Sequence, residues 1–272
     1  MEEHKSIPNW IESMAMRGHF FFNKRDLCSA FPDKSFNAIT RAITRLIAKN
    51  SVVSPWHNFY VIVPTEYKLK GIVPPTFYLD HLMHCLGCQY YVALLNAAEM
   101  YGAAHQRPQN FTVFTEGKAF HSGIKAGTEI LLFKREQLPM GFTRKFQTQT
   151  GYVNVSSPEL TALDLVDAEQ AVGGFTRVAT VLAELAEEIH FATVSPKLLD
   201  YFNVPVIQRL GYLLETVLNE QEKSGELFVL AQAANLHFRK VALKTTKEVP
   251  DDCELNKRWK IIVNQEIEID EL

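Results

Sequence analysis

Apolar residues at helical spacing define three short segments at the start of the chain. The first covers residues 7–17 and stops at Gly18, and the second covers residues 24–30 after Asn23, a residue type that often caps helices. The third runs over residues 34–49. One stripe of this third segment is apolar, and we expect it to be buried: Phe36, Ile39, Ile43, Leu46 and Ile47.

Two short strands are predicted directly after these helices. Residues 51–54 and 59–63 are rich in β-branched and aromatic side chains, and a turn that contains Pro55 separates them. Three helices followed by a β-hairpin form a winged helix-turn-helix, so we predict this domain over residues 1–64.

The polar side of the third helix is suited to a DNA duplex. It carries Asn37, Thr40, Arg41, Thr44 and Arg45. Arg41 and Arg45 are about one turn apart, so both project from one face and can reach guanine edges or phosphates. The amide of Asn37 can read adenine or bind a phosphate.

The flanking residues complete this hypothetical interface. We expect Lys34 and Ser35 to contact phosphates, and the hairpin turn to reach the neighbouring backbone through Trp56, His57 and Asn58. The alternative is a winged helix that binds only other proteins.

The rest of the chain changes character. Residues 65–79 are predicted to be a linker, and residues 80–272 a larger mixed α+β domain with an acidic C-terminal tail. In the order of the chain we expect a helix over 78–101, strands over 111–114, 129–133 and 151–155, helices over 158–168, 175–189, 196–201 and 205–220, and strand-like residues over 259–269. The expected fold class is therefore α+β.

Charge is unevenly distributed, although the net charge is only −3. Residues 1–64 hold eight Lys/Arg against five Asp/Glu, and residues 117–155 hold six against two. Residues 156–272 hold eleven against twenty. Two basic segments therefore precede an acidic C-terminal part, and such segregation can steer a polyanion to one face.

The second basic segment allows two interpretations. Its cations lie on or between predicted strands: Lys118, Lys125, Lys134, Arg135, Arg144 and Lys145. They form either a second face that contacts phosphates or a solvated face of the sheet.

Two other patterns give weaker evidence for a metal or catalytic site. The His and Cys residues in 81–88 cannot all converge on one zinc ion from a continuous helix. Glu116 and Lys118 follow a predicted strand, as in some metal-dependent nucleases, but no acidic partner is evident. We therefore expect no catalytic residue, metal or cofactor, and keep a nuclease-like enzyme using Glu116 and Lys118 as the alternative.

The compartment follows from two absences in the sequence. The four cysteines are too few for a disulfide framework, and no apolar run approaches the roughly 18 residues of a membrane span. We expect a cytoplasmic protein that does not contact a membrane.

Two stretches resemble the AbiEi antitoxin family of bacterial type IV toxin–antitoxin systems. Residues 90–109 contain the run Gly-Ala-Ala-His-Gln-Arg-Pro-Gln, and residues 151–165 are followed by the pair Gly173-Gly174. The resemblance extends to about residue 215, and the winged helix lies where the family carries one.

The resemblance implies a transcriptional repressor that acts as an antitoxin in abortive infection. Such a protein binds operator repeats in double-stranded DNA and regulates its own operon. Its implied functional partner is a nucleotidyltransferase-like toxin, neutralised without a stable complex. By position in the third helix, the implied DNA contacts fall on Asn37, Arg41 and Arg45.

Overall fold

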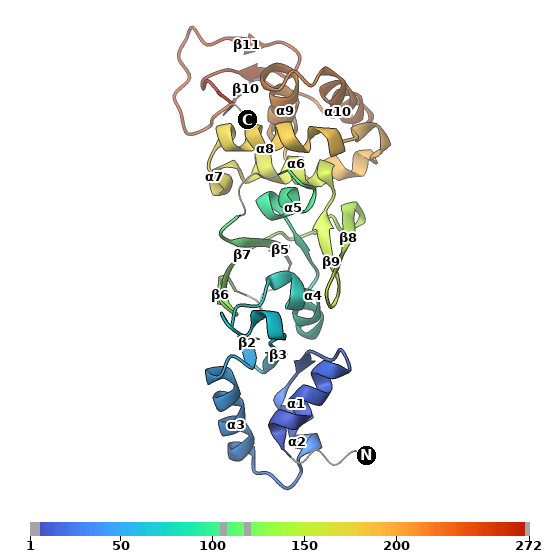
Figure 1. Ribbon diagram of the computed structural model, residues 1–272. Coiled ribbons are helices and arrows are strands. Elements are labelled where there is room, and N and C mark those ends of the chain that lie inside the picture. Colours follow the sequence, from blue (N-terminus) through green and yellow to red (C-terminus); the bar gives the residue numbers. More distant parts are fainter. Residues whose placement is uncertain (1–5, 104–107, 117–120, 270–272) are drawn as a thin grey trace. The chain divides into compact units, whose positions relative to one another are not determined.

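Helices and strands alternate along the whole chain (Figure 1), which confirms the expected α+β class. The structure is a computed structural model that describes residues 6–103, 108–116 and 121–269.

Contacts within the chain divide it into two compact units. Unit 1 comprises residues 1–90, 109–134 and 145–154, and unit 2 comprises residues 91–108, 135–144 and 155–272. The expected linker, residues 65–79, holds the short 3-10 helix η1 (Thr65–Tyr67) and the first residues of a longer helix. The units therefore do not follow the expected boundary between the linker and a second domain.

The first part of unit 1 has the element order of a winged helix-turn-helix. Its elements are α1 (Ile7–Met16), β1 (Phe21–Phe22), α2 (Lys24–Ala30), α3 (Phe36–Ala48), β2 (Val52–Trp56) and β3 (Phe59–Ile62). The strands form an antiparallel sheet in the order β1-β3-β2, with Phe21 opposite Val61 and Val52 opposite Ile62. The strand β1 was not predicted, because two residues are too few to show an alternating pattern.

Each of the three helices begins at a side chain that caps it. The side chain of Ser6 accepts a hydrogen bond from the backbone N–H of Asn9 at the start of α1. Asn23 and Asp26 form a reciprocal capping box at α2. Ser35 accepts from the N–H of Ala38 at α3, over 3.3 Å. These bonds satisfy backbone donors that the first turn of a helix leaves free, and they fix where each helix starts.

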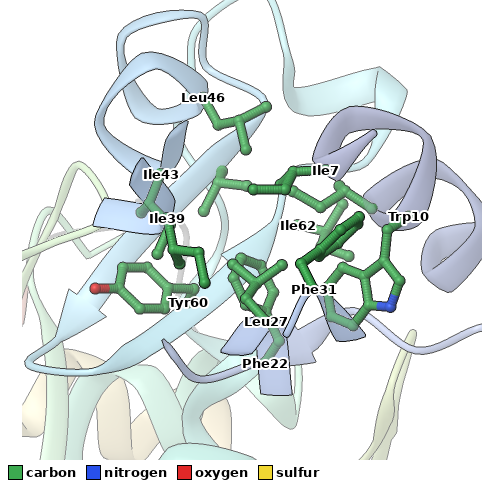
Figure 2. Packing of buried hydrophobic residues seen from close by; sticks show 12 residues of the cluster. Ile7, Trp10, Phe22, Leu27, Phe31, Ile39, Ile43, Leu46, Tyr60 and Ile62 are labelled. Atoms are coloured by element: carbon green, nitrogen blue, oxygen red, sulfur yellow. The ribbon is translucent and has the colours of Figure 1, made fainter. Parts of the chain in front are cut away.

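A single hydrophobic core joins these elements (Figure 2). Its side chains are less than a tenth exposed and include Ile7, Trp10, Phe22, Leu27, Phe31, Ile39, Ile43, Leu46, Tyr60 and Ile62. The ring of Trp10 meets that of Phe22 edge to face, with centroids 5.7 Å apart. Helix α3 therefore buries one stripe against α1, α2 and the sheet.

The buried stripe of α3 is narrower than predicted. Ile39, Ile43 and Leu46 are buried, but Phe36 is 59% exposed and Ile47 is 38% exposed. Both lie at the edge of the apolar stripe and near opposite ends of the helix, where neighbouring elements do not cover them. A 3.6-residue period identifies the direction of a stripe but not the reach of its neighbours.

A second, six-stranded sheet follows in the chain. Its order is β6-β7-β5-β4-β9-β8, and its strands are β4 (Tyr90–Val92), β5 (Phe111–Thr115), β6 (Gly123–Lys125), β7 (Thr128–Lys134), β8 (Thr143–Thr148) and β9 (Gly151–Ser156). Strands β5 and β7 are parallel, with Phe111 opposite Ile130, while β6 and β7 are antiparallel. The prediction missed β6 and β8, which are half exposed and carry no continuous apolar pattern.

The expected single helix over residues 78–101 is wrong. The chain forms α4 (Pro75–Leu86), then β4, then α5 (Leu94–Met100). Gly87 ends α4 in the left-handed conformation, with φ of 65°. Because β4 is buried throughout, it reads as a continuous apolar run, which periodicity cannot separate from a buried helix.

Unit 2 is mainly helical. Beyond α5 it contains α6 (Pro158–Asp167), α7 (Glu169–Val172), α8 (Phe175–Leu185), α9 (Val204–Tyr212) and α10 (Gln221–Ala233), and short 3-10 helices at Met140–Phe142, Ala186–Glu188, Phe191–Thr193 and Pro196–Tyr201. The expected helix over 205–220 ends as a π-helical turn, Leu213–Val217. Helix α10 was not predicted. The expected strand-like tail is limited to β12 (Ile261–Ile262), which pairs with β10 (Val241–Ala242) and β11 (Leu255–Asn256).

Trp259 anchors the C-terminal segment to the helices of unit 2. Its ring is fully buried, and its Nε1–H donates to Glu215 Oε2 over 2.9 Å. The ring packs directly on Gly211 of α9, so that a methyl group at this position would overlap it. Gly211 is therefore required by close packing.

We expect Gly211→Ala to lower the free energy of unfolding by about 1–3 kcal/mol, because the new methyl must displace the Trp259 ring. Urea unfolding followed by circular dichroism measures this change. Gly225→Ala in α10 is the matched control, since the nearest atom to its new methyl lies 3.9 Å away. Equal stability of the two variants would contradict the packing argument.

Candidate nucleic-acid interface

The polar face of α3 is open to solvent, as its sequence predicted. Asn37, Arg41, Thr44 and Arg45 are exposed, and Thr40 is half exposed. Within the described part of the chain, neither Arg41 nor Arg45 has a hydrogen-bond or ion-pair partner. Two guanidinium groups one turn apart are thus left available to an external anion.

The N-terminal end of α3 gathers further positive charge. Lys34 is exposed and its Nζ lies 5.8 Å from the ring centroid of Phe31, while Lys24 Nζ lies 5.3 Å from that of Phe36. A helix N-terminus itself favours anions, and these cations add to that field. Ser35 is occupied as the helix cap, so its hydroxyl oxygen already accepts a hydrogen bond.

Lys24 and Arg25 are interface candidates that the sequence interpretation missed. They are the first two residues of α2, and Arg25 is exposed. The sequence did contain a signal for them, because two cations directly after the capping residue Asn23 place both charges at the start of a helix.

The turn of the β-hairpin is held within unit 1. The backbone N–H of Lys24 donates to Asn58 Oδ1 over 3.0 Å. Lys125 Nζ lies 4.6 Å from the ring centroid of Trp56, and the same ring lies 6.3 Å from that of His121. Of the three predicted turn residues, only His57 is exposed, while Trp56 and Asn58 are half-buried. Sequence reasoning could not detect this, because the contacts join residues far apart in the chain.

The described cations of the second basic segment differ in exposure and belong to both units. Lys134 and Lys145 are exposed in unit 1, and Arg144 is exposed in unit 2 with its guanidinium 5.8 Å from the Tyr101 ring. Lys125 is half buried against Trp56, and burial lowers its pKa. Lys118 lies outside the described residues.

Arg135, the remaining member, is the centre of a buried polar cluster in unit 2. Its side chain is 12% exposed, and its Nη1 donates to Tyr91 Oη over 2.8 Å and lies 2.9 Å from Asp164 Oδ1. Asp164 is fully buried, and its Oδ2 accepts from Tyr91 Oη over 3.0 Å. Asp167 Oδ2 accepts from Nη2. Arg135 therefore neutralises internal acids instead of facing solvent.

Burial dominates the electrostatics of this cluster. It raises the pKa of Asp164 to about 7, against the opposing effects of the Arg135 charge and the Tyr91 hydrogen bond. Arg135 Nη1 is close enough to Oδ1 for an ion pair, but within the described residues Oδ1 has no donor with hydrogen-bond geometry. The carboxyl depends on Arg135 as its counter-charge.

The structure offers no support for the metal-based alternatives. His81 stacks on Phe21, with ring centroids 4.1 Å apart, while Cys85 is exposed. In the described ranges, no group of three or more His, Cys, Asp or Glu side chains could hold a metal ion. Glu116 is exposed after β5, and its proposed partner Lys118 is not described. No described helix is long and apolar enough to cross a lipid bilayer.

Comparison with known proteins identifies the region that the sequence resemblance indicated. Residues 91–216 match the family model of the AbiEi antitoxin C-terminal domain. The end of this match agrees with the expected limit near residue 215, and the winged helix lies outside it. No significant match to a curated protein was found.

Two solved structures align with this chain to different extents. The RV2827C protein from Mycobacterium tuberculosis aligns with a TM-score of 0.66 and 13% identity, covering 96% of this chain and 93% of that one. This shows a shared fold. An antigenic nucleotidyltransferase-like protein from Paracoccidioides brasiliensis aligns with a TM-score of 0.37 and 12% identity over 56% of this chain and 89% of that one, too low to indicate a common fold.

We expect Arg135→Met to destabilise unit 2 by about 3–5 kcal/mol, because it leaves Asp164 buried without a counter-charge. The pKa of Asp164 then rises further, whereas the unfolded chain releases this proton near 3.8. The folded variant binds more protons than the unfolded one above that pH, so its stability falls as the pH rises.

Urea unfolding at pH 5 and pH 8 measures this dependence. The variant should lose more stability between the two values than the parent protein does. The double variant Arg135→Met/Asp164→Leu is the control, and it should recover stability and lose the added pH dependence. A single variant as stable as the parent at pH 8 would contradict the role of Arg135.

Proposed function

Residues 91–216 match the family model of the AbiEi antitoxin C-terminal domain, and from this premise we propose that the chain is an antitoxin that binds operator DNA through helix α3 and represses its own operon. The matched domain supports the antitoxin role. The observation that carries DNA binding is the outward placement of Arg41 and Arg45 without internal partners in the described structure.

The chemistry of α3 suits a major groove. A helix fits this groove, arginine pairs with guanine O6 and N7, and asparagine pairs with adenine N6 and N7. Lys34, Lys24 and Arg25 lie at the first turns of α2 and α3, where they contact phosphates. Thr40 and Thr44 complete the face that enters the groove.

The hairpin contributes less than a free wing would. Trp56 and Asn58 are engaged inside unit 1, so His57 is the turn residue that reaches the backbone beside the groove. Lys134 and Lys145 of unit 1 and Arg144 of unit 2 are exposed and supply separate phosphate contacts.

The partner is proposed to be a nucleotidyltransferase-like toxin encoded beside this gene. The winged helix binds DNA, and the antitoxin domain neutralises the toxin without a stable complex. The cytoplasm, where both the operon and the toxin act, is the proposed compartment.

We expect Arg41→Ala/Arg45→Ala to weaken binding to the DNA upstream of the gene by tenfold or more, since each lost guanidinium contact contributes about 1–3 kcal/mol. The slope of affinity against salt should also decrease by about one for each lost phosphate contact. Fluorescence anisotropy across a salt series measures both quantities.

The matched control is Lys68→Ala/Lys70→Ala, which removes two exposed cations of unit 1 that do not belong to the polar face of α3. This control should bind almost as tightly as the parent protein. The proposed interface is wrong if the arginine variant and the control bind DNA equally well. Absence of binding to any duplex at low salt would instead favour a winged helix that contacts proteins.

We expect Arg41→Ala/Arg45→Ala to retain toxin neutralisation, because the altered side chains lie outside the matched antitoxin domain. Growth of cells that co-express the adjacent toxin gene with each variant measures this. Loss of rescue in the arginine variant, at a protein level equal to that of the parent, would show that neutralisation requires the DNA-binding face.

A further inference from the structure

An unexpectedly exposed apolar side chain lies on α3 at the border between its buried stripe and the polar face that is proposed to meet DNA. Phe36 is the first residue of the helix and is 59% exposed, while Ile39 and Ile43 of the same helix are buried. Lys24 Nζ lies 5.3 Å from the Phe36 ring centroid, so the ring is bordered by a cation that can hold a phosphate nearby.

Thr40 and Thr44 extend this apolar surface along the helix. Thr40 Oγ1 donates to the carbonyl of Phe36 and Thr44 Oγ1 donates to the carbonyl of Thr40, each over 3.0 Å. Both hydroxyl protons are thus used inside the helix. What these side chains add to an incoming surface is mainly a methyl group.

The three residues are four positions apart and therefore form one row on the helix surface. We name Phe36, Thr40 and Thr44 the apolar row. Arg41 precedes Thr44 by three positions, so a donor for base edges lies beside the apolar row.

The base edges of the major groove carry one apolar group, the C5-methyl of thymine, which phenylalanine and threonine methyl groups can contact. The N-terminal residues of a recognition helix are those that reach base edges. Resting on the proposed function, we propose that the apolar row reads thymine in the operator through its methyl group. The row therefore selects DNA over RNA, whose uracil lacks this methyl and whose major groove is too narrow for side chains.

A change in the DNA alone tests this inference. The full-length chain is used to enrich a duplex from a pool of random 20-base-pair sequences, and each thymine of that duplex is then replaced singly by deoxyuridine. At one or more positions the affinity should fall about threefold to fivefold, the effect of one buried methyl group. An enriched duplex without required thymines, or one indifferent to every replacement, overturns the inference.

Variants assign the contact to the apolar row. In Phe36→Ala the difference between thymine and deoxyuridine should disappear at one position. Thr40→Ser keeps the hydroxyl bond to the Phe36 carbonyl and removes only the methyl, so it should abolish the difference at a second position. Met16→Ala is the control, since Met16 is an 87% exposed apolar side chain of α1 and should leave both differences unchanged.

The results separate this inference from the function on which it depends. If the chain binds no duplex even at low salt, the proposed DNA binding fails and the inference fails with it. If the chain binds an enriched duplex, loses affinity in Arg41→Ala/Arg45→Ala and ignores the thymine methyl, the proposed function stands and only the inference is overturned.

Discussion

The burial of one stripe of α3 is the constraint on which the proposed interface depends. Ile39, Ile43 and Leu46 pack into the core that Figure 2 shows, and each such side chain contributes about 1.5–3 kcal/mol. Turning the helix by one residue, about 100°, would expose these groups. Arg41 and Arg45 are therefore held outward by apolar packing on the opposite side of the helix.

The same unit limits what else can contact a duplex. The hairpin turn is fastened to α2 by the bond between Asn58 and the Lys24 backbone and is covered by Lys125 at Trp56. Lys24 Nζ also lies 5.3 Å from the ring centroid of Phe36, so the start of α2 is near the first turn of α3. The proposed recognition therefore rests on one helix and on the cations at its N-terminal end.

Several charged side chains of unit 2 form internal ion pairs. Arg135, Lys244 and Arg258 pair with Asp164, Glu169 and Glu215, so cations of this unit serve to neutralise internal acids. Residues 156–272 hold twenty Asp/Glu against eleven Lys/Arg. This excess of negative charge makes the segment a poor ligand for a polyanion. Segregated charge therefore fits a chain in which a short basic domain binds DNA and the larger domain has a separate task.

The sequence by itself determined the three helices and hairpin of residues 7–63, the outward direction of Arg41 and Arg45, and the family resemblance carried by residues 90–109 and 151–165, because these depend on local periodicity and on short motifs. Only the tertiary structure decided the exposure of Phe36, the engagement of Trp56 and Asn58, and the burial of Arg135. Each of these depends on residues distant in the chain. A local pattern can indicate which side of an element is apolar, but long-range packing decides which side chains remain free to bind.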